Sequence, residues 1–201
     1  MSKIFVDEMQ GNTSTTISIP SGQTLNVAGN LSSTAGTISG TPSFPDGAKV
    51  NTIKHTGGTT AMTIDSTGRI LTPARPSFHV ATGTTQDAGT VVNWDTEIFD
   101  IGGNFNISTN LFTAPIAGVY CFNCTALQAG NGAQMTISIR KNAHNNGRFI
   151  ARTDGDSGEH HGCSVTALFN LAATDTVEVY LHLGRIYGDT QFTNFTGFLL
   201  G

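Results

Sequence analysis

The sequence predicts an all-β protein whose C-terminal part is a two-sheet sandwich. Only 12% of the 201 residues are charged, and the chain contains 24 Gly and 12 Phe, a composition that favours strands and turns over helices. Short strand-like stretches repeat after Ser77. In the stretch 176–183, Val and Leu alternate with Glu, Tyr and His, which places the apolar side chains on one face of a strand.

The strands are expected in eight segments, separated by turns such as those at Gly130–Gly132 and Asn146–Gly147. Eight strands divided by turns argue for two packed sheets. The predicted segments are Phe78–Thr82, Phe105–Ile107, Gly118–Leu127, Gln134–Arg140, Phe149–Arg152, Cys163–Leu171, Thr176–Leu183 and Gln191–Leu200.

Residues 1–76 differ in character from residues 77–201. Short β-prone stretches alternate there with Ser-Gly, Ala-Gly and Asp-Gly turns, and few large apolar residues occur. Pro73 and Pro76 form a stiff connector, which places the domain boundary between residues 76 and 77. We expect a β-rich attachment and trimerisation segment, ordered by packing against copies of itself, in preference to simple disorder.

Charge and cysteine content exclude several classes of partner. The net charge of −4 and a pI near 5.8 argue against nucleic-acid binding, which needs many Lys and Arg residues. No apolar run is long enough for membrane insertion, and the N-terminus lacks a signal-peptide pattern, so synthesis in a cytoplasm is expected. The three cysteines predict free thiols in the core.

A spaced series of aromatic and small residues carries a family resemblance. It resembles the signature of C1q domains, with Trp94 where that family usually has Phe and Cys124 where it usually has another aromatic residue. Phe112-Thr-Ala-Pro115, the pair Lys141-Asn142 and the ending Phe195-Thr-Gly-Phe-Leu-Leu200 agree with it. The series is Trp94, Asp100, Phe105, Phe112, Gly118, Tyr120 and Phe122.

The resemblance to the C1q/TNF family implies a jelly-roll sandwich that forms a compact homotrimer, with its chain termini at one end and ligand-binding loops at the other. Physically, the motif specifies a core. Tyr120, Phe122 and Cys124 share one face of a strand, and Phe105, Phe112 and Phe195 can fill the space between the sheets. The motif therefore indicates a fold, and function needs a separate argument.

The collagen stalk typical of C1q proteins is absent from residues 1–76, because Gly does not recur at every third position. The segment Thr59–Ile70 followed by a C1q-like head resembles short fibre or decoration proteins of tailed bacteriophages, particularly marine ones. This resemblance implies a structural protein of the virion, a tail fibre or capsid decoration. Residues 1–76 would then contact other virion proteins, and the head would contact host surface glycan or protein.

No catalytic site is predicted. Gly155-Asp-Ser-Gly158 matches the centre of the trypsin-like nucleophile loop, but no matching His stretch precedes it and Glu159-His160 replaces the usual Gly-Pro. An ordinary polar loop explains the same residues. An enzyme carried on a fibre, such as a glycan hydrolase or esterase, would need paired carboxylates or a base beside a nucleophile.

No metal or other cofactor is predicted. Cys121 and Cys124 have the spacing of a zinc pair, with His160, His161 and Cys163 downstream, but residues three apart on a strand point to opposite faces. Asp154, Asp156 and Glu159 offer oxygen ligands for calcium without a complete loop motif, so calcium binding stays open. His79, His144 and His182 are expected at the surface or in turns.

If the strand order follows the family, the loops around Gly130–Gly132, Thr153–His161 and Gly184–Thr190 lie together at the end remote from the termini. Their polar residues suit glycans or protein surfaces, although solvated loops explain each residue equally well. A soluble C1q-like recognition module outside any virion is the alternative function. The candidate binding residues are Asn131, Asp154, Asp156, Glu159, His160, His161, Arg185, Tyr187 and Asp189.

Overall fold

A computed structural model describes residues 51–130, 134–143, 148–152 and 161–201, and all regular structure in these ranges is β-strand. The strands are β1 (Thr52–Lys54), β2 (Thr60–Ile64), β3 (Ile70–Leu71), β4 (Ser77–Ala81), β5 (Gln86–Asp87), β6 (Thr90–Val91), β7 (Thr96–Ile101), β8 (Phe105–Asn106), β9 (Leu111–Thr113), β10 (Gly118–Leu127), β11 (Thr136–Lys141), β12 (Phe149–Arg152), β13 (Gly162–Leu171), β14 (Thr176–Leu183), β15 (Arg185–Ile186) and β16 (Asn194–Leu199).

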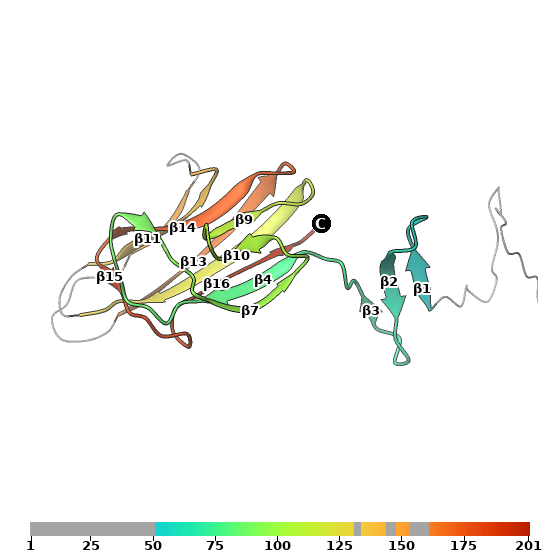
Figure 1. The fold of residues 1–201 in the computed structure, drawn as a ribbon, viewed down its shortest axis with the longest axis horizontal. Helices are drawn as coiled ribbons and strands as arrows, with labels where there is room; N and C mark the ends of the chain where they lie inside the picture. The colour runs from blue at the N-terminus through green and yellow to red at the C-terminus, as the bar shows by residue number, and fades with distance from the viewer. Residues whose placement is uncertain (1–50, 131–133, 144–147, 153–160) are drawn as a thin grey trace, which may run out of the picture. The chain divides into compact units, whose positions relative to one another are not determined.

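Residues 77–201 fold into two packed sheets, as the sequence predicts. One sheet has five strands in the order β13-β10-β16-β4-β7, and the other has the path β12-β11-β14-β9-β8, with β6 also paired to β14. Figure 1 shows the two layers, with β4, β7, β10 and β16 in one and β9, β11 and β14 in the other. Within each sheet, strands that are distant in the sequence lie side by side, because the chain crosses between the two layers. This arrangement is an all-β jelly roll.

Strand β10 organises the five-stranded sheet. It pairs along its whole length with β13 and, from Tyr120 to Thr125, with β16. Its side chains alternate strictly, so Tyr120, Phe122, Cys124 and Ala126 are buried between the sheets while their neighbours face outward. The sequence Gly118–Leu127 was predicted as a strand with these bounds, and the structure confirms it.

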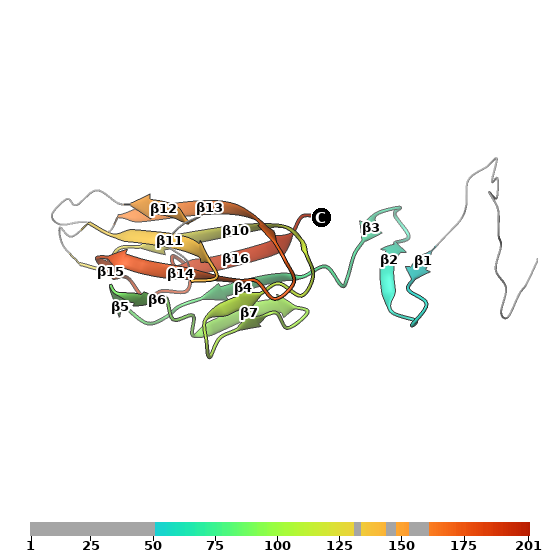
Figure 2. The same ribbon diagram turned by 90° about the horizontal axis from the view of Figure 1, so that it is seen from above.

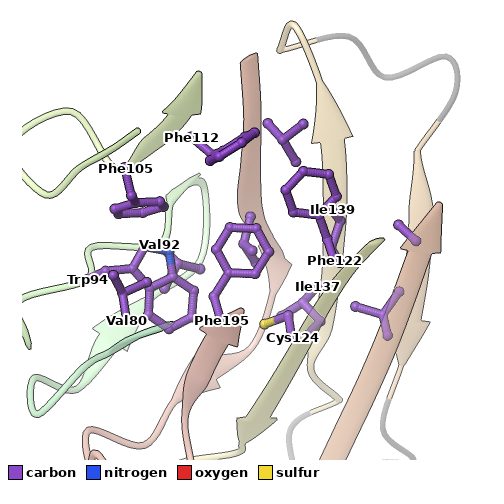
Figure 3. Close-up of a cluster of buried hydrophobic side chains, with 14 of the residues drawn as sticks. Val80, Val92, Trp94, Phe105, Phe112, Phe122, Cys124, Ile137, Ile139 and Phe195 are labelled. Carbon is purple, nitrogen blue, oxygen red and sulfur yellow. The ribbon is translucent and has the colours of Figure 1, made fainter. Parts of the chain in front are cut away.

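The core is a cluster of stacked aromatic rings. Phe122 lies 5.4–6.3 Å from the ring centroids of Phe78, Phe112, Tyr120, Phe169 and Phe195. Figure 3 shows the rings of Phe112, Phe122 and Phe195 near Ile137 and Ile139, which belong to β11 of the facing sheet. Burying each large ring contributes roughly 1.5–3 kcal/mol. The predicted filling of the core by Phe105, Phe112 and Phe195 is confirmed.

Gly197 lets the rings approach the backbone of β16. A Cβ atom at this position would lie 2.5 Å from Phe78 Cε1 and from Phe122 Cδ1, closer than real Cβ atoms come to other heavy atoms. Any side chain here would displace the rings at the centre of the core. The glycine in the sequence Phe195-Thr-Gly-Phe therefore has a packing reason.

The predicted strand list for residues 77–201 needs correction. It misses β7 and β9, an edge strand interrupted by a bulge and a strand of only three residues, and the two-residue strands β5, β6 and β15. The predicted strand Gln191–Leu200 begins three residues early, because Asp189 accepts hydrogen bonds from the N–H groups of Gln191, Phe192 and Thr193 and holds them in a turn. The turn predicted at Asn146–Gly147 lies outside the described residues.

Strands β1 to β3 form a separate three-stranded antiparallel sheet. Asp65 closes the turn between β2 and β3. Its carboxylate accepts hydrogen bonds from the backbone N–H groups of Thr67 and Arg69, and it forms an ion pair with Arg69 Nε at 2.7 Å. These bonds hold the pKa of Asp65 well below its usual range. Gly68 adopts φ +84°, which suits glycine in this turn. The sequence Asp-Ser-Thr-Gly thus specifies a well-made hairpin.

Candidate functional site

Three segments meet at the end of the sandwich remote from the C-terminus and from the start of β4, which we call the apex (Figure 2). The N–H of Gln128 donates to His161 O, that of Ala129 donates to Arg185 O, and that of Tyr187 donates to Leu127 O. At the other end the C-terminus lies beside the start of β4, since the N–H of Leu199 donates to Pro76 O. Figure 2 shows β5 and β15 at one end of the sandwich and the C-terminus at the other.

A loop between β4 and β7 joins the apex and is ordered by polar contacts. Asp95 accepts hydrogen bonds from the Thr84 hydroxyl at 2.6 Å and from the Gly83 N–H at 2.9 Å. Partial burial opposes ionisation of Asp95, but these hydrogen bonds outweigh it and lower its pKa. The Gly188 N–H donates to Thr85 Oγ1, which fastens this loop to the segment after β15. The apex is therefore a preorganised surface along the ranges that the structure describes.

The structure places four of the nine candidate binding residues. His161, Arg185, Tyr187 and Asp189 all lie at the apex, and the exposed Arg185 forms a 3.1 Å ion pair with Asp87 of β5. Asp189 has a structural role as well, because it closes the turn before β16. The other five candidates lie outside the described residues: Asn131, Asp154, Asp156, Glu159 and His160.

The outer face of the five-stranded sheet is a second surface, which we call the open face. Cross-strand pairing aligns Leu168, Cys121, Phe198, Ser77 and Ile101 in one row across all five strands. Phe198, Ile101 and Leu168 are 43%, 43% and 54% exposed. Such a contiguous row of exposed apolar side chains is typical of an interaction surface.

The next row of the open face is polar but uncharged. It contains Thr166, Asn123, Thr196, His79 and Phe99. Within it the Asn123 amide donates to Thr166 Oγ1 at 2.9 Å, and the rings of His79 and Phe99 meet edge to face at 6.0 Å. Neither row of the open face contains Asp, Glu, Lys or Arg. Sequence analysis missed this surface, since its composition depends on which strands pair and in which register.

The outer face of the six-stranded sheet, which we call the polar face, has the opposite character. Arg140 and Glu178 form an ion pair there with side chains only 9% and 6% exposed, and the Arg140 guanidinium lies 3.8 Å above the Tyr180 ring centroid. Ser138 Oγ is hydrogen-bonded to His182 Nε2 at 2.7 Å. The alternation predicted for residues 176–183 is confirmed, with Glu178, Tyr180 and His182 on one side.

The cysteines do not form a metal site in the described part of the chain. Cys124 is buried in the core, whereas Cys121 points to the open face, so the prediction that all three thiols lie in the core is wrong for Cys121. Burial raises the pKa of Cys163 to about 11 and raises that of Cys124 as well, which keeps both thiols protonated near neutral pH. Along the described ranges, no three His, Cys, Asp or Glu side chains gather closely enough to hold a metal ion.

The described residues contain no support for the nucleophile loop considered as a catalytic alternative. Ser157 and its neighbours lie outside the described residues, as does His144. The Ser138 hydroxyl, although paired with His182, is fully buried and cannot reach a substrate. Within the ranges that are described, no helix is long and apolar enough to cross a membrane.

Comparison with known proteins decides the family. The model of the C1q domain matches residues 77–200. This chain belongs to the C1q family. Among solved structures, the globular domain of the zebrafish complement 1qA protein superposes on the C1q domain with a TM-score of 0.54 at 21% identity, covering 63% of this chain and 98% of that one. Murine APRIL gives a TM-score of 0.54 at 14% identity, over 63% and 99% of the two chains. At these identities the likeness shows the fold.

The curated relatives are mammalian. Complement C1q tumor necrosis factor-related protein 3 is 30% identical over 102 residues in both mouse and human, which is 50% of this chain and 41% of the relative. The chain therefore spans less than half the length of these relatives. Nothing in these comparisons indicates a bacteriophage origin or a virion fibre.

Proposed function

We propose that this chain forms a homotrimer through its open face and presents the apex as a non-enzymatic binding surface. The main support is an uncharged row of side chains that crosses the whole five-stranded sheet, and the large side chains of this row are exposed. The row contains Leu168, Cys121, Phe198, Ser77 and Ile101. A patch of this kind lowers the free energy of the chain when a partner covers it. A closed ring of three copies covers the patch on every copy.

The apex is the surface that such a trimer leaves free for ligands. Its described segments carry both charges of the Arg185 and Asp87 pair, with side chains 55% and 82% exposed, and the half-buried Tyr187 two residues after Arg185. Charged and aromatic groups on a rigid support suit polar ligands such as glycans or protein loops. The four described candidates His161, Arg185, Tyr187 and Asp189 belong to this proposed site, and three equivalent apices would add avidity.

Binding at the apex can be tested with the fluorescently labelled full chain on arrays of glycans and cell-surface extracts. The substitution Arg185→Ala is expected to weaken binding at least tenfold. The matched control is Lys141→Ala, which removes an ion-paired cation, the partner of Asp175 at 2.6 Å, from the opposite end of the sandwich. Equal binding by both variants would place the ligand elsewhere and overturn the apex proposal.

A virion location is the more specific form of this proposal. Residues 1–76 would attach the trimer to the particle, as a tail fibre or capsid decoration made in the host cytoplasm, and residues 77–201 would face the host surface. Its support is the sequence Thr59–Ile70, which forms a compact β-hairpin where C1q proteins usually have collagen. A soluble recognition module outside any virion is the competing function.

Immunogold labelling separates these two locations. Antibodies against residues 77–201 are expected to decorate virus particles purified from the source culture, and a C1q-like module without a virion role leaves the particles unlabelled. Protein found only in the particle-free fraction would contradict the virion proposal and leave the binding proposal standing.

A further inference from the structure

The small sheet of β1, β2 and β3 has two faces of different character. Register pairs Ile53 with Met62 and Ile64 with Ile70, and because Met62 and Ile64 are two residues apart on β2, all four side chains share one face. The other face carries Thr52, Ala61, Thr63 and Leu71. One face of this sheet is thus a continuous apolar surface, which we call the stem face.

Among the described residues, nothing covers the stem face. Ile53, Ile64 and Ile70 are 45%, 36% and 65% exposed, and no residue between Thr52 and Leu71 is buried. Strands of three, five and two residues cannot hold together in water unless their apolar face packs against something. The turn at Asp65 is nevertheless fully hydrogen-bonded. A hairpin with a hydrogen-bonded turn and an exposed apolar face is stabilised when a partner packs against that face.

We infer that the partner is the same face of the other copies, so that three small sheets pack through their stem faces into a β-rich stem. This inference rests on the proposed trimer. The connector from Leu71 to Ser77 spans at most about 22 Å when fully extended. Ser77 lies in the apolar row of the open face, opposite Ile101 and Phe198, so each small sheet is tethered near the proposed interface between copies.

Tethering makes self-association the favoured outcome. Short linkers hold connected modules at effective concentrations in the millimolar range, which compensates for a small contact area. The stem face itself carries no charge, so three copies can meet on it without repulsion; the neighbouring Lys54 follows a register shift at the sheet edge. The stem would replace the collagen triple helix as the device that joins three C1q domains.

Cysteine cross-linking tests the inference with a matched pair of neighbours. In the full chain, Ile70→Cys places a thiol on the stem face and Leu71→Cys places one on the opposite face of the same strand. After treatment with a short bismaleimide, Ile70→Cys is expected to give at least ten times more interchain product on a denaturing gel than Leu71→Cys. The parent chain sets the background from Cys121, Cys124 and Cys163.

Native mass spectrometry of the same samples separates the two proposals. A trimer in which Ile70→Cys and Leu71→Cys cross-link equally, or not at all, overturns the stem and leaves the trimeric head. A monomer overturns both. Trypsin cleavage at Lys54, whose scissile bond neither substitution alters, gives a further readout, since Ile70→Asp should speed it at least tenfold and Leu71→Asp should not. Protection of Lys54 without interchain product would assign the cover to another segment of the same chain and contradict the inference.

Discussion

The two outer faces of the sandwich differ in how their side chains are covered. On the polar face, the buried or half-buried Arg140 and Ser138 pair within the chain with Glu178 and His182, respectively. On the open face, apolar side chains such as Phe198 stay exposed with no charge among them. The polar groups of the polar face pair within one copy, whereas the open face is, in our proposal, covered by the other copies of a trimer.

The contrast shows where the stability of one chain ends and its assembly begins. The two sheets enclose the same aromatic core, so both faces belong to one folding unit. Substitutions on the polar face should therefore change the stability of the fold, and substitutions on the open face should change the association of copies. Each prediction below sharpens or breaks that division.

The largest effect is expected from the buried ion pair of the polar face. Glu178→Ala leaves the Arg140 charge buried without its partner and should lower the free energy of unfolding by about 3–5 kcal/mol. Chemical denaturation at fixed protein concentration measures this. The double variant Arg140→Met with Glu178→Leu removes both charges and should come within about 1 kcal/mol of the parent chain. If Glu178→Ala lowers the free energy of unfolding by less than about 1 kcal/mol, the ion pair is not desolvated.

A smaller effect is expected in the layer that both faces share. Gly197→Ala places a methyl group 2.5 Å from the rings of Phe78 and Phe122, and overpacking of this kind costs about 1–3 kcal/mol. Gly201→Ala is the control, since nothing lies within 4 Å of a Cβ there. The measurement is the thermal and denaturant midpoint of each variant, and equal midpoints would contradict the packing described for β16.

The smallest effect is a pH dependence on the polar face. Burial, with the charges of Arg148 and Arg140, lowers the pKa of His182 below its usual value of 6.5. The folded state therefore resists protonation that the unfolded state accepts, so stability is complete above about pH 6.5 and falls as the pH drops through the folded pKa. In His182→Asn the loss of stability between pH 7 and 5 should be shallower than in the parent chain. An unchanged slope would remove His182 from the account.

The sequence predicts the inside of this molecule better than its outside. Alternation along Gly118–Leu127 places Tyr120 and Phe122 in the core, because inward positions on a strand repeat every second residue. The resemblance to C1q domains adds Phe105, Phe112 and Phe195, which are buried as well. The ends of β10 follow from Gly118 and from the turn after Leu127. Strand β7 escapes prediction, since its bulge breaks the alternation that a sequence pattern can show.

Contacts between distant strands escape prediction for a physical reason. Arg140 and Glu178 are 38 residues apart, and the open-face row joins Ser77 to Leu168 through two intermediate strands. Such neighbours depend on strand order and register, which local propensity does not specify. Four apex residues are placed together in space, and their binding role stays a prediction.

The central claim is that the open face is buried between three copies, and solution mass tests it most directly. Native mass spectrometry of the full chain should give three times the 21.1 kDa of one chain. Phe198→Asp, which puts a charge into the apolar row, should give a folded monomer with an unchanged far-UV circular dichroism spectrum. The matched substitution Thr166→Asp, at the far edge of the polar row, should leave more trimer than Phe198→Asp does. A parent chain that is monomeric at micromolar concentration would contradict the account.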